Sequence, residues 1–157
     1  VRFTQLSPPK IEIVGRTKHF INSCGEELMV DNADRALERA CHETSSQIDK
    51  YTMAPVYGQS GQPGYHEWFI EFTQRPEDVQ RFMDILDVEL QAINGDYGAK
   101  RNLNLGLLAP HLYDMPRGAF YEWMKRRDKL GGQNKVPRLS NSREYADSIL
   151  EMLRQGD

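Results

Sequence analysis

Hydrophobic and polar positions alternate along several segments of the chain in the manner typical of β-strands. Residues 65–72 (YHEWFIEF) form the strongest such segment, and residues 51–58 (YTMAPVYG) alternate in the same way. Residues 59–64 (QSGQPG) between them are turn formers, so the two segments are expected to pair as a hairpin with a long loop. The β-branched run at residues 11–16 (IEIVGR) predicts a further strand that ends near a glycine.

A second hairpin is expected at residues 19–30 (HFINSCGEELMV), because Gly25 lies in the middle with apolar residues on both sides. Residues 103–113 (LNLGLLAPHLY) favour another short strand. Within the strongest strand segment, the period of two places Trp68 and Phe69 on opposite faces. We interpret both aromatic residues as parts of the core rather than as a platform on which nucleic-acid bases stack.

Apolar residues that recur every three or four positions predict helices between these strands. One helix follows Asp31 or Asn32, either of which is suited to cap it. A second helix is expected to begin at Pro76, whose fixed φ suits the first helical position. The turn-forming residues 94–98 (NGDYG) are expected to end that helix.

Two more helices are predicted in the C-terminal third of the chain. Residues 119–130 (AFYEWMKRRDKL) carry a helical repeat, and Asn141 with Glu144 forms the pattern of a capping box that opens the last helix. Taken together, the elements predict an α+β fold: a small mixed or antiparallel sheet with helices packed on it.

Composition narrows the class of protein. A chain of 157 residues with 39% hydrophobic and 27% charged residues suits one globular domain with its own core. The net charge of −3 argues against a general nucleic-acid partner, and the chain has no apolar run long enough to span a membrane. Cys24 and Cys41 are expected to be free thiols, buried as small apolar groups, in a reducing, cytoplasmic compartment. Their surroundings show no metal-ligand spacing, so no metal site is expected.

Positive charge is concentrated near the C-terminus. Between residues 117 and 143 eight basic residues stand against two acidic ones, which leaves +6 there and −9 on the rest of the chain. Such a field suits a phosphate-bearing ligand or an acidic partner surface, and it also suits a plain solvated helix face. One hypothesis is therefore a non-catalytic α+β interaction module that docks on a partner through residues 117–143.

The segment GRTK provides a first indication of chemistry. The strand at residues 11–16 leads into Gly15 and Arg16, then Lys18, and then the hairpin. This order resembles the junction at which adenylate-forming enzymes (acyl-CoA synthetases, luciferases and peptide-synthetase adenylation domains) pass from a large N-terminal domain to a small C-terminal one. The resemblance implies that Lys18 is the hinge and that Arg16 contacts the nucleotide. An ordinary exposed turn and a structural ion pair are the respective alternatives.

A narrower resemblance covers nearly the whole chain. The segments SCGEELMVDNADRAL, YHEWFIEF, DVELQAINGDYGAKR, MPRGAFYEWMKRR and GGQNKVPRL occur in the order seen in the C-terminal domain of the auxin-responsive promoter family of acyl-acid amido synthetases. Bacterial members are the closer match. The resemblance implies that residues 1–17 are the end of an interdomain linker with a first strand, that residues 18–157 are a mobile C-terminal domain, and that a large N-terminal adenylation domain lies outside this chain.

The same resemblance implies a two-step reaction in the full-length protein. A carboxylic acid would react with magnesium-ATP to give an acyl-adenylate, and the amine of an amino acid would then displace AMP. A thiol acceptor is the alternative. ATP and magnesium would be held mainly by the N-terminal domain, so that the isolated chain is expected to be inactive. Glu26 and Glu27, beside the glycine of the second hairpin, are candidates for the face presented in the acceptor step, with plain surface charge as the alternative.

Lys135, within the segment LGGQNKVPRL, falls where that family has a late lysine, which implies roles in catalysis and nucleotide binding. Physical reasoning supports the choice, because a carboxylate and the α-phosphate of ATP repel each other and a cation between them offsets that repulsion. Lysine provides a compact charge on a long stem, and Pro137 fixes φ just behind it. A solvated loop lysine is the alternative.

Overall fold

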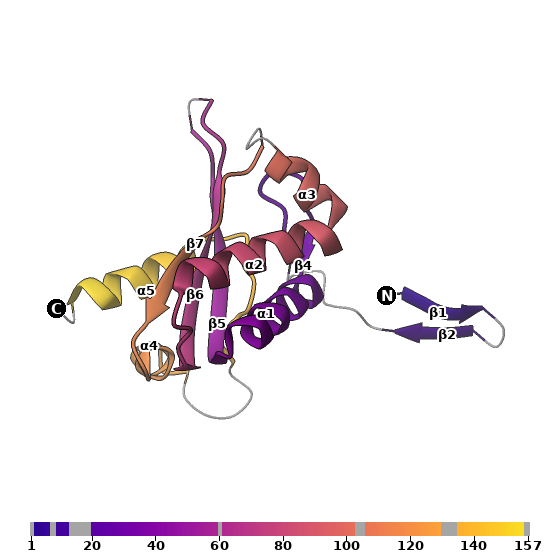
Figure 1. Ribbon diagram of the computed structural model, residues 1–157. Coiled ribbons are helices and arrows are strands. Elements are labelled where there is room, and N and C mark those ends of the chain that lie inside the picture. The colour runs from indigo at the N-terminus through magenta and orange to yellow at the C-terminus, as the bar shows by residue number, and fades with distance from the viewer. Residues whose placement is uncertain are drawn as a thin grey trace.

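Figure 1 shows a computed structural model of the chain. It describes residues 2–6, 9–12, 20–59, 61–102, 106–129 and 135–155, with side chains from residue 20 onward. The described residues form an α+β fold, as the sequence predicts.

A three-stranded mixed sheet lies at the centre of the fold. Strand β5 (Gln47–Val56) and strand β6 (Tyr65–Gln74) pair antiparallel, with Met53 opposite Trp68. Strand β7 (His111–Met115) then joins the other side of β6 in parallel, which gives the order β5-β6-β7. The predicted hairpin is thereby confirmed, and the short strand predicted from residues 103–113 forms at the end of that range and extends two residues beyond it, to Met115.

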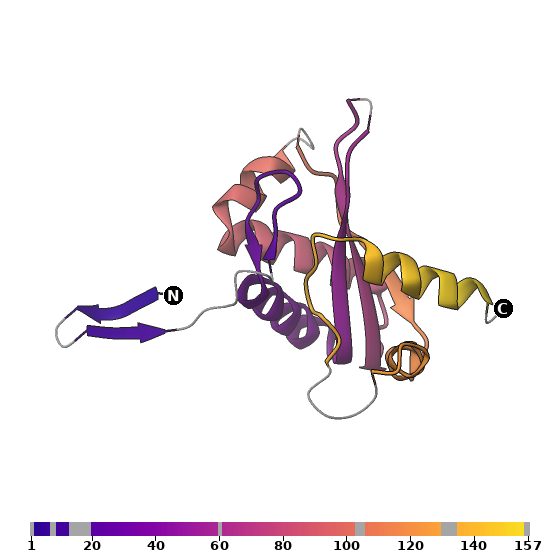
Figure 2. The same cartoon turned by 180° about the vertical axis from the view of Figure 1, so that it is seen from behind.

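Two helical layers cover the sheet, so that β6 is buried on both faces. Trp68, on one face, packs in a core with helix α1 (Val30–Thr44) and helix α2 (Val79–Ile93). Phe69, on the other, packs with helix α4 (Ala119–Arg126) and helix α5 (Glu144–Gln155). Both aromatic side chains are fully buried, as predicted. Figure 2 shows α5 crossing the face of the sheet opposite to α2.

Two small two-stranded sheets and one short helix complete the described chain. Strands β3 (Phe20–Ile21) and β4 (Leu28–Met29) pair antiparallel, which confirms the second hairpin. Strands β1 (Arg2–Leu6) and β2 (Pro9–Glu12) form a separate two-stranded sheet. Helix α3 (Gly95–Arg101) follows α2 directly. It begins inside the turn-forming residues predicted to stop α2, so these residues end one helix and start another.

The predicted start of α1 is wrong by about two residues. The helix begins at Val30, with Met29 at the N-cap position, and Asn32 lies inside the first turn. There the Asn32 side chain accepts a hydrogen bond from the backbone N–H of Met29 at 3.0 Å. Asn32 therefore satisfies a free donor from within the helix instead of ahead of it.

The other two predicted helix starts need similar corrections. Pro76 does not begin α2, because Asp78 is the N-cap and accepts from the N–H of Arg81 at 2.9 Å. Asn141 does not cap α5, which begins at Glu144. The backbone N–H of Glu144 donates to the hydroxyl oxygen of Ser142 at 3.2 Å. Asn141 has other partners, described below.

Candidate functional site

The segment that carries Lys135 is fastened to the outer edge of the central sheet. We call residues 135–140 the lysine segment. The backbone of Met53 on β5 donates to the carbonyl of Arg138 at 2.9 Å and accepts from the N–H of Ser140 at 3.2 Å. Leu139 between them is 1% exposed, and the hydroxyl of Thr52 donates to the carbonyl of Pro137 at 2.5 Å. The lysine segment therefore has a fixed base on β5.

Side chains reinforce this attachment. The guanidinium of Arg138 donates to Asp34 Oδ2 at 2.6 Å, and the hydroxyl of Tyr51 donates to Asp34 Oδ1 at 2.7 Å. Burial raises the pKa of Tyr51, and the neighbouring Asp34 carboxylate raises it further, so the hydroxyl stays protonated and remains a donor. Asp34 on α1 thus ties the lysine segment and β5 to the same helix.

Lys135 itself is exposed, and its ammonium group has no hydrogen bond or ion pair with any residue that the structure describes. It lines a groove of about 810 Å³ between α1, β5 and α4, together with the cations of Lys50, Lys129 and Arg138. An unpaired ammonium on a fixed base can reach an anion brought to this face without first breaking an ion pair within the domain. That is the property required of a lysine that acts on a ligand held by another domain.

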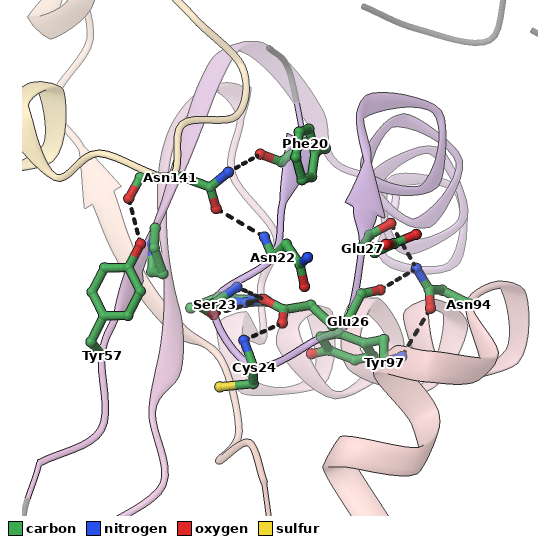
Figure 3. Close-up of polar contacts among 12 residues, drawn as sticks. Phe20, Asn22, Ser23, Cys24, Glu26, Glu27, Tyr57, Asn94, Tyr97 and Asn141 are labelled. Carbon is green, nitrogen blue, oxygen red and sulfur yellow. Dashed lines mark hydrogen bonds and ion pairs between the residues drawn. The ribbon is translucent and has the colours of Figure 1, made fainter. Parts of the chain in front are cut away.

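The second candidate region is the bend between β3 and β4, residues 22–27, which we call the bend (Figure 3). Glu26 is fully buried beneath it. One carboxylate oxygen accepts from the backbone N–H and the hydroxyl of Ser23, at 3.0 and 2.7 Å, and the other accepts from the N–H of Cys24 at 2.6 Å. Glu26 therefore closes the bend on itself.

His66 on β6 supplies the remaining partner of Glu26. Its Nε2 lies 2.8 Å from Glu26 Oε1, and both side chains are fully buried. Since an ionised carboxylate only accepts, Nε2 carries the hydrogen. Burial by itself raises the pKa of Glu26, but the hydrogen bonds from His66, Ser23 and Cys24 outweigh it and lower that pKa to about 2.

This low pKa predicts a loss of stability in acid. A carboxyl with a folded pKa of about 2 and an ordinary value of 4.5 stabilises the fold above pH 4.5, and this contribution is lost as the pH falls toward 2. Its size is about 3 kcal/mol. We expect the melting temperature of the chain to fall over this range, and Glu26→Gln to lose much of the pH dependence. An unchanged slope in that variant would contradict the assignment to Glu26.

Two asparagines hold the bend from outside, as Figure 3 shows. Asn94, where α2 meets α3, donates its amide to the carbonyls of Glu26 and Glu27 at 3.0 and 3.4 Å. Asn141 accepts from the N–H of Asn22 at 2.9 Å and donates to the carbonyl of Phe20 at 3.0 Å. The bend is therefore fixed from both of its limbs.

The structure separates the two predicted glutamates. Glu27 is exposed and has φ 43°, a left-handed conformation that is uncommon for a residue other than glycine. Glu26 is 0% exposed, so it neither lies on a surface offered to a substrate nor forms plain surface charge. Its burial follows from the donors that converge on its carboxylate. Only Glu27 remains a candidate for the acceptor step.

The other predicted site residues are placed as follows. Arg16 and Lys18 lie outside the described residues, so their roles stay predictions. Lys135 and the bend come from opposite ends of the chain, and Asn141 connects them. Cys24 and Cys41 are free, and both are partly exposed rather than buried. Sequence reasoning missed the contacts of Asn94, His66 and Asn141 with the bend, because their partners lie 40 or more residues away.

Much of the positive charge between residues 117 and 143 is already neutralised within the domain. Arg126 pairs with Glu122, and Arg143 pairs with both Glu67 and Asp147. Arg127 pairs with Glu144, and Arg138 pairs with Asp34. The basic residues for which the described chain provides no partner are Arg117, Lys125, Lys129 and Lys135. Four separate cations make a weaker docking surface than the sequence count suggests.

Two further observations concern metals and membranes. Among the described residues, no group of three or more His, Cys, Asp or Glu side chains is arranged to hold a metal ion. None of the helices in that part of the chain has the length and apolarity that a membrane span requires.

Comparison with known proteins places this fold. Among solved structures, a GH3.15 acyl acid amido synthetase matches with a TM-score of 0.69 and 22% identity, over 88% of this chain and 27% of that one. The structure described as AtGH3.15 acyl acid amido synthetase in complex with 2,4-DB matches with a TM-score of 0.67 and 18% identity, over 88% and 26%. At these identities the likeness establishes the fold, and the chain spans about a quarter of the length of those proteins.

Comparison with curated proteins finds no match. A family model, described as the GH3 family C-terminal domain, matches residues 31–144, which is well over half of the chain and includes Lys135, Asn94 and most of the central sheet. The chain therefore belongs to the GH3 family and comprises its C-terminal domain.

Proposed function

We propose that this domain is the mobile C-terminal part of an ATP-dependent acyl-acid ligase, which forms an acyl-adenylate and transfers the acyl group to the amine of an amino acid. The observation that carries the proposal is the setting of Lys135: its exposed ammonium has no partner among the described residues and comes directly before residues bound to β5. A lysine with only a surface role does not require that the adjacent segment be bound to a β-strand. The solved structures with this fold are described as acyl acid amido synthetases, which supports the reaction class.

In the first step Lys135 stabilises negative charge on the reacting groups. When bound, ATP supplies the α-phosphate to which an oxygen of the substrate carboxylate bonds, while the bond to the β-phosphate breaks and pyrophosphate leaves. The Lys135 ammonium lies between the two anions as they approach and stabilises the negative charge that develops. We assign the magnesium ion that accompanies ATP mainly to the N-terminal domain.

In the second step the domain presents its bend to the adenylate. Lys18 is the hinge for this movement, and Arg16 contacts the nucleotide. Glu27, exposed at the end of the bend that leads into β4, would orient the incoming amine or accept its proton. The nitrogen bonds to the acyl carbon, the bond from that carbon to the AMP oxygen breaks, and AMP leaves with the electron pair.

The proposal is tested in the full-length protein by acid-dependent exchange of pyrophosphate into ATP. A panel of carboxylic acids that includes 2,4-DB, the compound in the solved complex, serves as substrate. Amide or thioester products are then identified by mass spectrometry with the twenty amino acids or coenzyme A as acceptor. We expect exchange with at least one acid, and an amide product. A thioester product would leave the adenylation assignment in place and change the acceptor.

A substitution at the hinge separates the two steps. Lys18→Pro fixes φ at the pivot and is expected to leave exchange within about twofold while slowing amide formation by roughly tenfold or more, because a small misplacement of reacting groups has a large effect on rate. Lys18→Ala, which leaves the backbone free, serves as the matched control. Equal loss of both steps in Lys18→Pro would count against the hinge.

A further inference from the structure

Asn141 joins the two candidate regions of the domain. Its side-chain oxygen accepts from the N–H of Asn22, and its amide donates to the carbonyl of Phe20, at 2.9 and 3.0 Å. The backbone of a neighbouring β-strand would likewise accept from one N–H and donate to one carbonyl. The Asn141 side chain therefore pairs with the backbone at β3 in place of a further strand. Asn141 and Phe20 are separated by 121 positions in the sequence.

The backbone around Asn141 is held on several sides. The preceding residue, Ser140, donates its N–H to Met53 on β5 at 3.2 Å, and its hydroxyl donates to the carbonyl of Ser142 at 2.9 Å. The carbonyl of Asn141 accepts from the hydroxyl of Tyr57 at 2.8 Å, as Figure 3 shows. Asn141 therefore directly follows the lysine segment with its backbone held in place, and its side chain links that position to the bend.

The contacts of Asn141 differ from those of Glu26 and His66 in their surroundings. The buried pair fixes the inside of the bend, and Asn94 fixes the limb that leads to β4. Asn141 is partly exposed, and its partner Asn22 is exposed. Water can replace hydrogen bonds at such a position, so removing the side chain costs little stability and mainly releases the β3 limb of the bend.

We propose that Asn141 is a positioning residue for acyl transfer: it holds the bend in register with the lysine segment, so that both move as one body when the domain turns. This inference rests on the proposed function and extends it to the relation between the two faces. Loss of the Asn141 side chain leaves the lysine segment bound to β5. It allows the bend, which includes Glu27, to shift relative to that segment.

The test compares half-reactions in the full-length protein, with the acid that gives the fastest exchange in the panel and an equimolar mixture of amino acids as acceptor. Asn141→Ala is expected to lower kcat for amide formation by roughly 10- to 100-fold, the scale of small misplacements, while pyrophosphate exchange stays within about twofold. Tyr57→Phe removes one support of Asn141 and is expected to give a smaller loss in the same step. Asn102→Ala, which replaces an exposed asparagine directly after α3, is the matched control.

The outcomes separate the inference from the function on which it rests. Normal amide formation in Asn141→Ala would overturn the inference alone. A parallel fall of exchange and transfer would also overturn it, since Asn141 would then serve the fold in general, and melting temperatures of the variants check this reading. Absence of exchange with every acid in the wild-type protein would overturn the proposed function and the inference together.

Discussion

Replacing Lys135 with alanine in the full-length protein is expected to slow acid-dependent pyrophosphate exchange by about 10²–10³-fold, the effect of removing one preorganised electrostatic stabiliser. The ammonium has no partner among the described residues. Lys135 is at the start of a segment that two backbone hydrogen bonds attach to Met53. Its removal therefore breaks no ion pair within the domain, so the stability of the fold is expected to change by less than about 0.5 kcal/mol.

Lys129→Ala is the matched control for this prediction. Lys129 is an exposed lysine that lines the same groove, also without a partner in the described chain, but its backbone has no attachment to β5. We expect exchange in this variant to stay within about twofold of wild type. Equal effects of the two substitutions would show that the groove contributes only general positive charge, and exchange unaffected by Lys135→Ala would show that the assignment of Lys135 is wrong. Lys135→Arg is expected to restore little, because a planar guanidinium does not replace a point charge on a flexible stem.

Replacing His66 with alanine is expected to lower the free energy of unfolding of the 157-residue chain by about 3–5 kcal/mol. The substitution leaves the carboxylate of Glu26 fully buried without the N–H donor that His66 supplies from β6, and it opens a cavity against Tyr97, whose ring lies 5.8 Å from that of His66. Chemical denaturation followed by circular dichroism measures the difference.

His42→Ala provides the comparison, because the side chain of His42 is 77% exposed on α1 and its loss is expected to change the unfolding free energy by less than about 0.5 kcal/mol. The double variant Glu26→Gln with His66→Ala is expected to be less destabilised than the sum of the single ones, since no buried carboxylate is then left without its partner. Strict additivity would contradict the coupling of the pair.

Much of the architecture was predictable from hydrophobic periodicity. The period of two along β6 correctly assigned Trp68 and Phe69 to opposite faces, and the helical repeats located α1, α2, α4 and α5. The helix starts were less predictable, since a cap depends on the direction from which the chain arrives. Asn32, for example, satisfies the N–H of Met29 from inside the helix.

The candidate site was predictable only where it rests on a local motif. Lys135 could be located because glycine and proline flank it in the sequence, and the bend could be located because Gly25 lies in its middle. The burial of Glu26 could not, since it arises from donors in the folded bend and from His66, 40 residues away. The pattern of Asn141 and Glu144 indicated a helix cap. Asn141 instead takes two partners about 120 residues distant, which no local pattern encodes.

The attachment of the lysine segment has a consequence for solubility. β5 is the outer strand of its sheet, and an outer strand with free N–H and C=O groups can pair with the same strand of another molecule. Here the outward groups of Met53 are bound by Arg138 and Ser140, Pro55 has no N–H, and its carbonyl accepts from Arg143 at 2.9 Å. The residues that position Lys135 therefore also protect this stretch of the sheet edge from self-association.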